Sequence, residues 1–105
     1  MKRQPGILSV ISGDERLTPF QKDVLMVTAD IPLGQVRPYR WIAYRIGKPG
    51  ASRAVGNTLN ANPYPLRIPC HRVVREGGSI GGFARGRRAK RRLLASEGID
   101  WLRGT

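Results

Sequence analysis

The chain has one cysteine and one histidine, and the two are adjacent in the sequence Pro69-Cys70-His71-Arg72. A thiolate is the softest nucleophile that a side chain offers, so it suits the removal of an alkyl group from an oxygen atom. A free thiol is mostly protonated at neutral pH, and a nearby base or positive field must favour the thiolate. His71 is the available imidazole, but neighbouring residues of an extended chain point to opposite faces. Either Pro69 bends the chain or a bridging water carries the proton. A lone cysteine is also often a plain buried apolar residue, and that alternative stays open.

The charge of the chain indicates a polyanionic partner. Nineteen Lys and Arg face seven Asp and Glu, a formal net charge of +12 over 105 residues. Lys occurs only at positions 2, 22, 48 and 90, so most of the cations are Arg, whose fork of donors matches phosphate. Nucleic acid is the expected partner, because a polyanion relieves the self-repulsion of so many cations. An acidic membrane surface or an acidic protein is the alternative.

Other classes of protein fit the composition poorly. No apolar run approaches the roughly 20 residues of a membrane span, and no stretch resembles a signal peptide. We therefore expect no membrane association and a cytoplasmic or otherwise intracellular location, in the nucleoid or nucleus with the DNA. One cysteine and one histidine cannot form a tetrahedral zinc site without carboxylates, so no metal is expected.

Three short helices are predicted ahead of the cysteine. Thr18-Pro19-Phe20-Gln21 is a typical helix start, with a Thr cap, a proline at the first helical position and Gln three residues after the cap. That helix should end before Pro32. A second helix is expected over 41–46, ending at Gly47, and a third from 51 to about 61, ending at Asn62-Pro63.

The second and third helices have the spacing of a helix-turn-helix. The third helix should bury Ala51, Ala54, Val55 and Leu59 and present a polar stripe of Arg53, Asn57 and Asn60. In a helix-turn-helix the second helix enters a groove of DNA. An ordinary helical hairpin with a solvated polar face is the alternative.

The rest of the chain predicts smaller elements. Residues 72–74 and 79–80 flank Glu76-Gly77-Gly78 and predict a β-hairpin. A basic helix is expected from about 87 to 96, with Gly98 as its cap. Its core residues should be Ala89, Leu93 and Leu94, while six cations, namely Arg85, Arg87, Arg88, Lys90, Arg91 and Arg92, should face phosphate.

In the N-terminal region, residues 1–17, the apolar residues follow no sustained helical or strand periodicity. Its apolar residues, Ile7, Leu8, Val10 and Ile11, predict a short strand or a docking contact, followed by a loop. We therefore expect an N-terminal extension over 1–17 and one domain over 18–105. The fold should be mainly α, a three-helical, winged-helix-like helix-turn-helix domain with a small β-hairpin and a C-terminal basic helix.

The Pro-Cys-His-Arg sequence resembles the active-site signature of the O6-alkylguanine-DNA alkyltransferase family. Further stretches resemble the family's other landmarks in the same order: 31–34, Pro38-Tyr39, 47–56, Asn62-Pro63 and 93–98. The resemblance covers about residues 18–100. It implies DNA repair by a methylated-DNA–protein-cysteine S-methyltransferase, a single-turnover enzyme that acts as a monomer without cofactor or metal. The alkyl group passes irreversibly from O6-alkylguanine in double-stranded DNA to Cys70 after base flipping, with O4-alkylthymine as a second candidate substrate.

The resemblance also implies roles for individual residues. Glu97 orients His71, which receives the thiol proton through a water, and Asn62 supports the active-site turn. Arg53 fills the gap that the flipped base leaves in the base stack. Without the resemblance, Glu97 would be equally well explained as a surface acid near a helix end.

The remaining implied contacts are with the nucleotide. Tyr39 crowds the phosphate and binds the flipped base, and the carbonyl of Val73 reads the guanine amino group. Asn57 and Arg72 are also expected to contact DNA. Phe83 and Ala84 stand where family members often have Tyr and Ser, whose hydroxyl groups would stabilise the leaving guanine.

The sequence departs from the family pattern in two ways, and two alternative functions stay open. Only about 17 residues precede the match, where relatives usually carry another domain. Loss of two hydroxyl hydrogen bonds at Phe83 and Ala84 should slow transfer by about one to two orders of magnitude.

One alternative is a non-enzymatic alkyltransferase-like damage sensor, which flips the base without repairing it but usually lacks the cysteine. The other is a plain helix-turn-helix regulator, which needs neither Cys70 nor Glu97.

Overall fold

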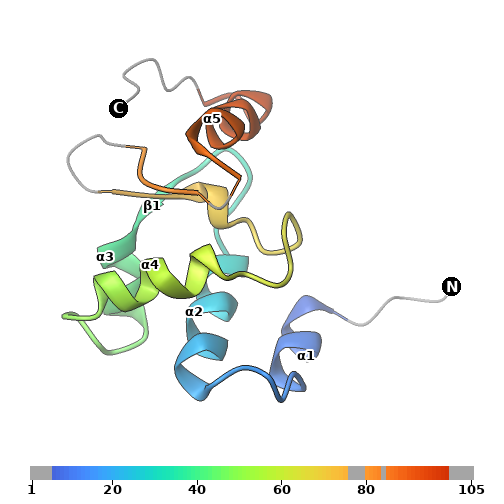
Figure 1. The fold of residues 1–105 in the computed structure, drawn as a ribbon, viewed down its shortest axis with the longest axis vertical. Coiled ribbons are helices and arrows are strands. Elements are labelled where there is room, and N and C mark those ends of the chain that lie inside the picture. The colour runs from blue at the N-terminus through green and yellow to red at the C-terminus, as the bar shows by residue number, and fades with distance from the viewer. Residues whose placement is uncertain (1–5, 76–79, 84, 100–105) are drawn as a thin grey trace, which may run out of the picture.

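The computed structural model describes residues 6–75, 80–83 and 85–99 (Figure 1). Five helices, one 3-10 turn and two short strands follow one another in these ranges. They are α1 (Ile7–Ser12), α2 (Pro19–Ala29), β1 (Arg37–Pro38), α3 (Tyr39–Arg45), α4 (Ser52–Asn60), the 3-10 turn (Cys70–Arg72), β2 (Val73–Val74) and α5 (Arg87–Ser96). The fold is mainly α-helical, as the sequence predicts.

The N-terminal segment forms helix α1, so the prediction of a short strand is wrong. Ile7, Val10 and Ile11 lie three and four residues apart, which places them on one helical face. Ile11 is fully buried, and Ile7 packs against the same hydrophobic cluster. Burial of this face against α2 explains the helix, and it confirms the docking contact that the sequence also allowed.

Helix α2 begins as predicted at Thr18-Pro19. The Thr18 hydroxyl accepts a hydrogen bond from the Gln21 backbone N–H at 3.1 Å, and the Gln21 side chain accepts one from the Thr18 N–H at 2.9 Å. This reciprocal pair satisfies two backbone donors that a helix start leaves free. The helix buries Val24 and Leu25 and ends before Pro32, as expected.

Helices α3 and α4 form the predicted helix-turn-helix. The turn between them contains Gly47 at φ 75°, a left-handed conformation that suits glycine. It is closed by a hydrogen bond from the Lys48 N–H to the Ala43 carbonyl at 2.9 Å. Of the apolar face predicted for α4, Val55 and Leu59 are buried but Ala54 is exposed. Thr58 is buried instead, and its hydroxyl donates a hydrogen bond to the Ala54 carbonyl at 3.0 Å.

The two strands pair in parallel, with Arg37 opposite Val73 and Pro38 opposite Val74. The sequence did not predict this pairing. It brings Tyr39, the first residue of α3, beside the segment that follows Cys70. Residues 76–79 of the predicted hairpin lie outside the described ranges.

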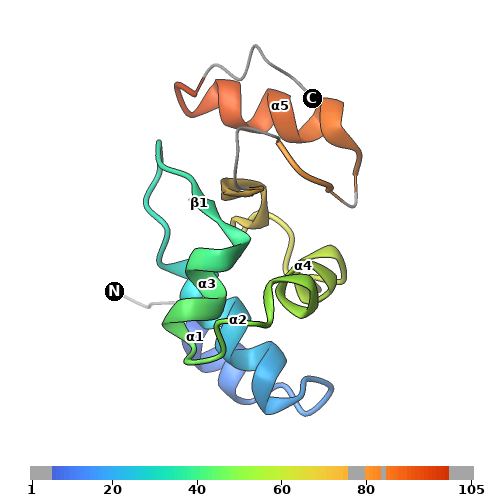
Figure 2. The same ribbon diagram turned by 90° about the vertical axis from the view of Figure 1, so that its left-hand side faces the viewer.

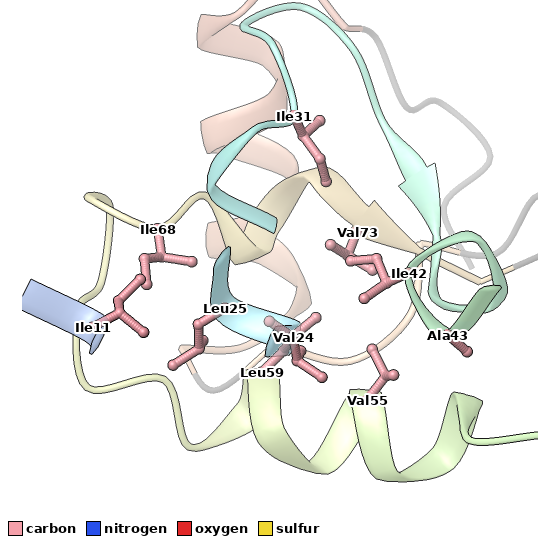
Figure 3. Packing of buried hydrophobic residues seen from close by; sticks show 10 residues of the cluster. All are labelled: Ile11, Val24, Leu25, Ile31, Ile42, Ala43, Val55, Leu59, Ile68 and Val73. Carbon is pink, nitrogen blue, oxygen red and sulfur yellow. The ribbon is translucent and has the colours of Figure 1, made fainter. Parts of the chain in front are cut away.

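The core lies between the helix-turn-helix and the cysteine segment. Figure 3 shows Val24, Leu25, Val55 and Leu59 directed toward one another, with Ile42 and Val73 on one side of them. Helix α5 lies at the opposite end of the molecule from α1 and α2 (Figure 2). No helix within the described ranges has the length and apolar character that crossing a membrane requires.

Helix α5 covers the 3-10 turn with a different face from the one predicted. It buries Leu94 as expected, but Ala89 and Leu93 are only half-buried. Lys90 is fully buried, so its assignment to the phosphate-facing cations is wrong. The five arginines of that set, Arg85, Arg87, Arg88, Arg91 and Arg92, are exposed.

Candidate active site and nucleic-acid interface

Cys70 begins the 3-10 turn at the end of an irregular loop, residues 61–69. Pro69 has ψ 65°, outside the extended region, and the Cys70 N–H donates to the Ile68 carbonyl at 2.8 Å. The chain therefore bends at Pro69, but the hydrogen bonds of the described residues include none between the thiol and His71, so the bend alone does not join them. The Cys70 thiol is free and half-buried.

Asn62 connects this loop to the sulfur. Its side-chain amide nitrogen lies 3.5 Å from the Cys70 sulfur and donates to the Ile68 carbonyl at 3.2 Å. Its amide oxygen accepts from the Tyr64 N–H at 2.8 Å. One side chain thus holds the loop closed and places a donor against the thiol.

His71 and Glu97 form a buried pair. The His71 Nε2 lies 2.7 Å from the Glu97 Oε2, and His71 is 3% exposed. Hydrogen bonds from Arg72 and then from His71 lower the pKa of Glu97 from 4.5 to about 2, so this carboxyl is ionised at neutral pH. An ionised carboxylate requires Nε2 to carry the ring proton, which leaves Nδ1 as the basic nitrogen.

Arg72 faces the protein rather than an open surface. Its Nε and Nη2 donate to the two oxygens of Glu97 at 2.8 and 2.9 Å, and its Nη1 donates to the Ile31 carbonyl at 2.8 Å. This bidentate pair fixes the carboxylate that orients His71. The sequence grouped Arg72 with the DNA-binding residues, and its contact with Glu97 was not foreseen.

Lys90 is a site residue that the sequence analysis missed. Its ammonium donates to the carbonyls of Val73 at 2.6 Å and Gly82 at 3.1 Å, and lies 5.8 Å from the centre of the Tyr39 ring. Burial lowers its pKa from 10.5 to about 8. Burial also raises the pKa of Tyr39, whose hydroxyl donates to Gly82 at 3.4 Å. The available signal was the helical spacing of Lys90 with Leu94, since residues four apart share a face.

A cleft of about 460 Å³ opens beside these residues. It is lined by Tyr39, Arg40, Ser52, Arg53, Gly56, Asn57, Asn60, Arg75 and Gly82, which include the whole polar stripe predicted for α4. Arg40 and Arg75 were not predicted. The described lining contains three arginines and no carboxylate, so it suits an anionic ligand.

A smaller hollow lies beside the thiol and shares part of its lining with this cleft. Cys70, Leu59 and Phe83 line the hollow together with four residues that also line the cleft: Tyr39, Gly56, Asn60 and Gly82. Phe83 therefore lies beside the thiol, while Ala84 is outside the described ranges.

Fold and site together define a helix-turn-helix domain that carries a cysteine, histidine and glutamate site beside an arginine-lined cleft. The family model of the 6-O-methylguanine DNA methyltransferase DNA-binding domain matches residues 19–99. The chain belongs to this family.

Relatives with known names agree with this assignment. The methylated-DNA–protein-cysteine methyltransferase of Salmonella typhimurium is 46% identical over 96 residues, which cover 89% of this chain and 56% of the relative. That of Methanothermobacter thermautotrophicus is 44% identical over 83 residues, 79% of this chain and 46% of the relative. The chain spans about half the length of the curated relatives it matches.

Solved structures show the same fold. The Mycobacterium tuberculosis OGT in complex with DNA superposes with a TM-score of 0.78 at 44% identity, covering 81% of this chain and 52% of the other. Atl1 of S. pombe, in complex with damaged DNA containing O6-carboxymethylguanine, superposes with a TM-score of 0.73 at 29% identity, covering 81% of both chains.

Proposed function

We propose that this protein repairs DNA by transferring an alkyl group from O6-alkylguanine to Cys70, once per molecule. The observation that carries the proposal is the position of the thiol. It lines a small hollow that shares four lining residues with the arginine-lined cleft, and the His71–Glu97 pair is adjacent to it in the fold. A plain regulator would need the cleft but not this arrangement around a sulfur.

Delivery of the base depends on α4. The reactive oxygen of O6-alkylguanine lies within the base stack of a duplex, so the nucleotide must be extruded before a thiol can reach it. Arg53 lines the cleft from an exposed position in the first turn of α4, where it can enter the stack in place of the lost base. Asn57, one turn further on, and Tyr39 contact the neighbouring backbone. The proposed approach is through the minor groove, whose degenerate pattern suits damage in any sequence.

The transfer is a displacement at carbon. The basic Nδ1 of His71 receives the thiol proton through a bridging water, and Glu97 stabilises the imidazolium that results. The sulfur attacks the alkyl carbon, a carbon–sulfur bond forms and the bond to O6 breaks. The electron pair goes to O6 of guanine, which takes up one proton in place of the one that the thiol released, and guanine remains in the DNA. Cys70 becomes a thioether, so no second turnover follows and no cofactor is required.

The carbonyl of Val73 positions the guanine. We assign to it a hydrogen bond from the exocyclic amino group of the flipped base. The Lys90 ammonium already donates to this carbonyl at 2.6 Å, and a carbonyl oxygen has a second lone pair for the base. Lys90 thus holds the base-reading carbonyl in place from the buried side.

Phe83 limits the rate of the proposed reaction. It supplies an aromatic wall beside Cys70 but has no hydroxyl to donate to the leaving guanine. The side chain of Ala84 likewise has no donor. Developing charge on guanine is therefore less stabilised than with Tyr and Ser at these positions.

A second candidate function is a damage sensor that flips O6-alkylguanine without repairing it. The likeness to Atl1 along 81% of both chains favours it, since that protein was crystallised with damaged DNA. The presence of Cys70 beside the hollow favours repair instead. In either case the protein acts where the genome is, in the nucleoid or nucleus, and as a monomer.

The two functions are separated by the fate of the lesion. Duplex oligonucleotide containing O6-methylguanine is incubated with excess protein, digested to nucleosides and separated by chromatography. Repair converts O6-methyl-2′-deoxyguanosine to 2′-deoxyguanosine in proportion to the protein added. A sensor binds the duplex and leaves the modified nucleoside unchanged.

A further inference from the structure

The N-terminal segment, residues 6–17, contacts the loop that carries Cys70. The Tyr64 hydroxyl donates to the Asp14 carboxylate across 50 positions of sequence. Arg16 donates to the same carboxylate, with its Nε and Nη2 at 2.9 and 2.6 Å from the two oxygens. The Asp14 side chain is only 7% exposed as a result.

Apolar packing supports the same contact. Ile11 of α1 and Ile68 of the loop are both fully buried in the hydrophobic cluster. Figure 3 shows them on the same side of the cluster, next to each other and to Leu25. The segment is therefore attached to the loop at two places, one polar at Tyr64 and one apolar at Ile68.

Both attachment points lead to Cys70, one to its sulfur and the other to its backbone. The Tyr64 N–H donates to Asn62, whose amide nitrogen lies 3.5 Å from the Cys70 sulfur. The Ile68 N–H donates to the Tyr64 carbonyl at 3.0 Å, and the Ile68 carbonyl accepts from the Cys70 N–H at 2.8 Å. Tyr64 is thus two hydrogen bonds from the Cys70 sulfur through Asn62, and two from the Cys70 backbone N–H through Ile68.

The loop needs such support because its own conformation is strained. Leu66 has φ 72°, a left-handed conformation that a bulky residue rarely adopts, and the residue is 56% exposed. A strained turn persists when its surroundings hold it in place. Among the described contacts, Asp14 and Ile11 are the part of the N-terminal segment that does so.

We propose that Asp14 and Tyr64 form a latch that positions the active-site loop for alkyl transfer. The latch acts through Asn62: while Tyr64 is held by Asp14, the Asn62 amide stays against the sulfur. Asp14 lies outside residues 19–99, which the family model matches. The proposal rests on the proposed transfer function.

The variants that test it are Asp14→Asn, Tyr64→Phe and the double variant, with Glu15→Gln as the matched control. Glu15 adjoins Asp14, is exposed and loses the same charge on conversion to its amide. Single-turnover transfer is measured by rapid quench against duplex containing O6-methylguanine, well below the melting temperature of every variant. The maximal rate constant and the half-saturating DNA concentration are determined separately.

Each latch variant should lower the maximal rate constant about tenfold, which corresponds to the loss of one charge-assisted hydrogen bond. The half-saturating DNA concentration should stay unchanged. The double variant should be no slower than either single variant, because both remove the same contact. Glu15→Gln should match the unmodified protein. Unchanged rates in the latch variants, additive losses, or an effect confined to the half-saturating concentration would overturn the latch.

A second readout is independent of repair. The rate of Cys70 alkylation by iodoacetamide should fall in the same variants and not in Glu15→Gln. If the unmodified protein fails to take up methyl groups, the transfer function fails, and the iodoacetamide rates still decide whether the latch positions the thiol. Equal iodoacetamide rates in the unmodified protein and all four variants would contradict it.

Discussion

Replacement of the buried Lys90 by methionine is expected to alter how stability depends on pH. Methionine keeps much of the length and apolar character of the side chain and removes the ammonium. In the native protein that ammonium has no exposed surface, and its partners are the carbonyls of Val73 and Gly82. The variant therefore leaves two acceptors without this donor but relieves the protein of a buried charge.

The sign of the effect follows from the pKa of Lys90. Burial lowers it from 10.5 to about 8, so between these values the unfolded chain binds a proton that the folded chain does not. Stability rises with pH wherever the unfolded state binds more protons. The contribution of Lys90 to the free energy of unfolding should therefore rise by about 2 to 3 kcal/mol between about pH 7 and about pH 10, since one pKa unit is worth about 1.4 kcal/mol.

The assay is urea unfolding of the native protein and of Lys90→Met at a series of pH values. The difference between their free energies of unfolding isolates Lys90 from the other groups that titrate at high pH. Lys48→Met is the matched control, because Lys48 is exposed in the turn after α3. A pH-independent difference for Lys90→Met, or one equal to that of Lys48→Met, would refute the inference that the ammonium is buried.

Three further variants test the roles of individual site residues. Glu97→Gln should slow transfer about a hundredfold or more at neutral pH because His71 loses the carboxylate that fixes its tautomer; a loss of less than threefold in single-turnover assays would contradict that role. Arg53→Ala should slow repair of duplex substrate about tenfold or more and leave reaction with free O6-benzylguanine nearly unchanged, since the free base needs no extrusion. Equal losses on the two substrates would mean that Arg53 supports the fold. Phe83→Tyr combined with Ala84→Ser should raise the transfer rate about tenfold with unchanged DNA affinity, as two restored donors would lower the barrier by about 1.4 kcal/mol; an unchanged or slower rate would show that the hydroxyls are not needed.

The elements predicted correctly are those that local sequence specifies. The Thr18 capping box, the glycine turn between α3 and α4, and the basic helix α5 each depend on residues within a few positions of one another. The same holds for the Arg53, Asn57 and Asn60 stripe, whose members all line the cleft. Helical spacing is sufficient to place side chains on a shared face.

The features that were missed depend on contacts between distant parts of the chain. Strands β1 and β2 are 35 positions apart in the sequence. With two residues each, they are too short to show an alternation of apolar and polar residues. Arg72 and Lys90 carry the same charges as residues that face solvent, and only the folded structure shows that one binds Glu97 and the other Val73. The Asp14–Tyr64 contact joins residues 50 positions apart, and its loop has no repeating pattern.

The central claim is that Cys70 receives the alkyl group, and peptide mass spectrometry tests it most directly. The protein is incubated with duplex oligonucleotide containing O6-methylguanine, digested, and compared with Cys70→Ser treated in the same way. The account predicts one methyl group per molecule on the peptide that contains Cys70, stable to reducing agents, and none on the serine variant, which still binds the duplex. An unmodified Cys70 peptide after full binding of the lesion, or a methyl group on any other residue, would contradict it.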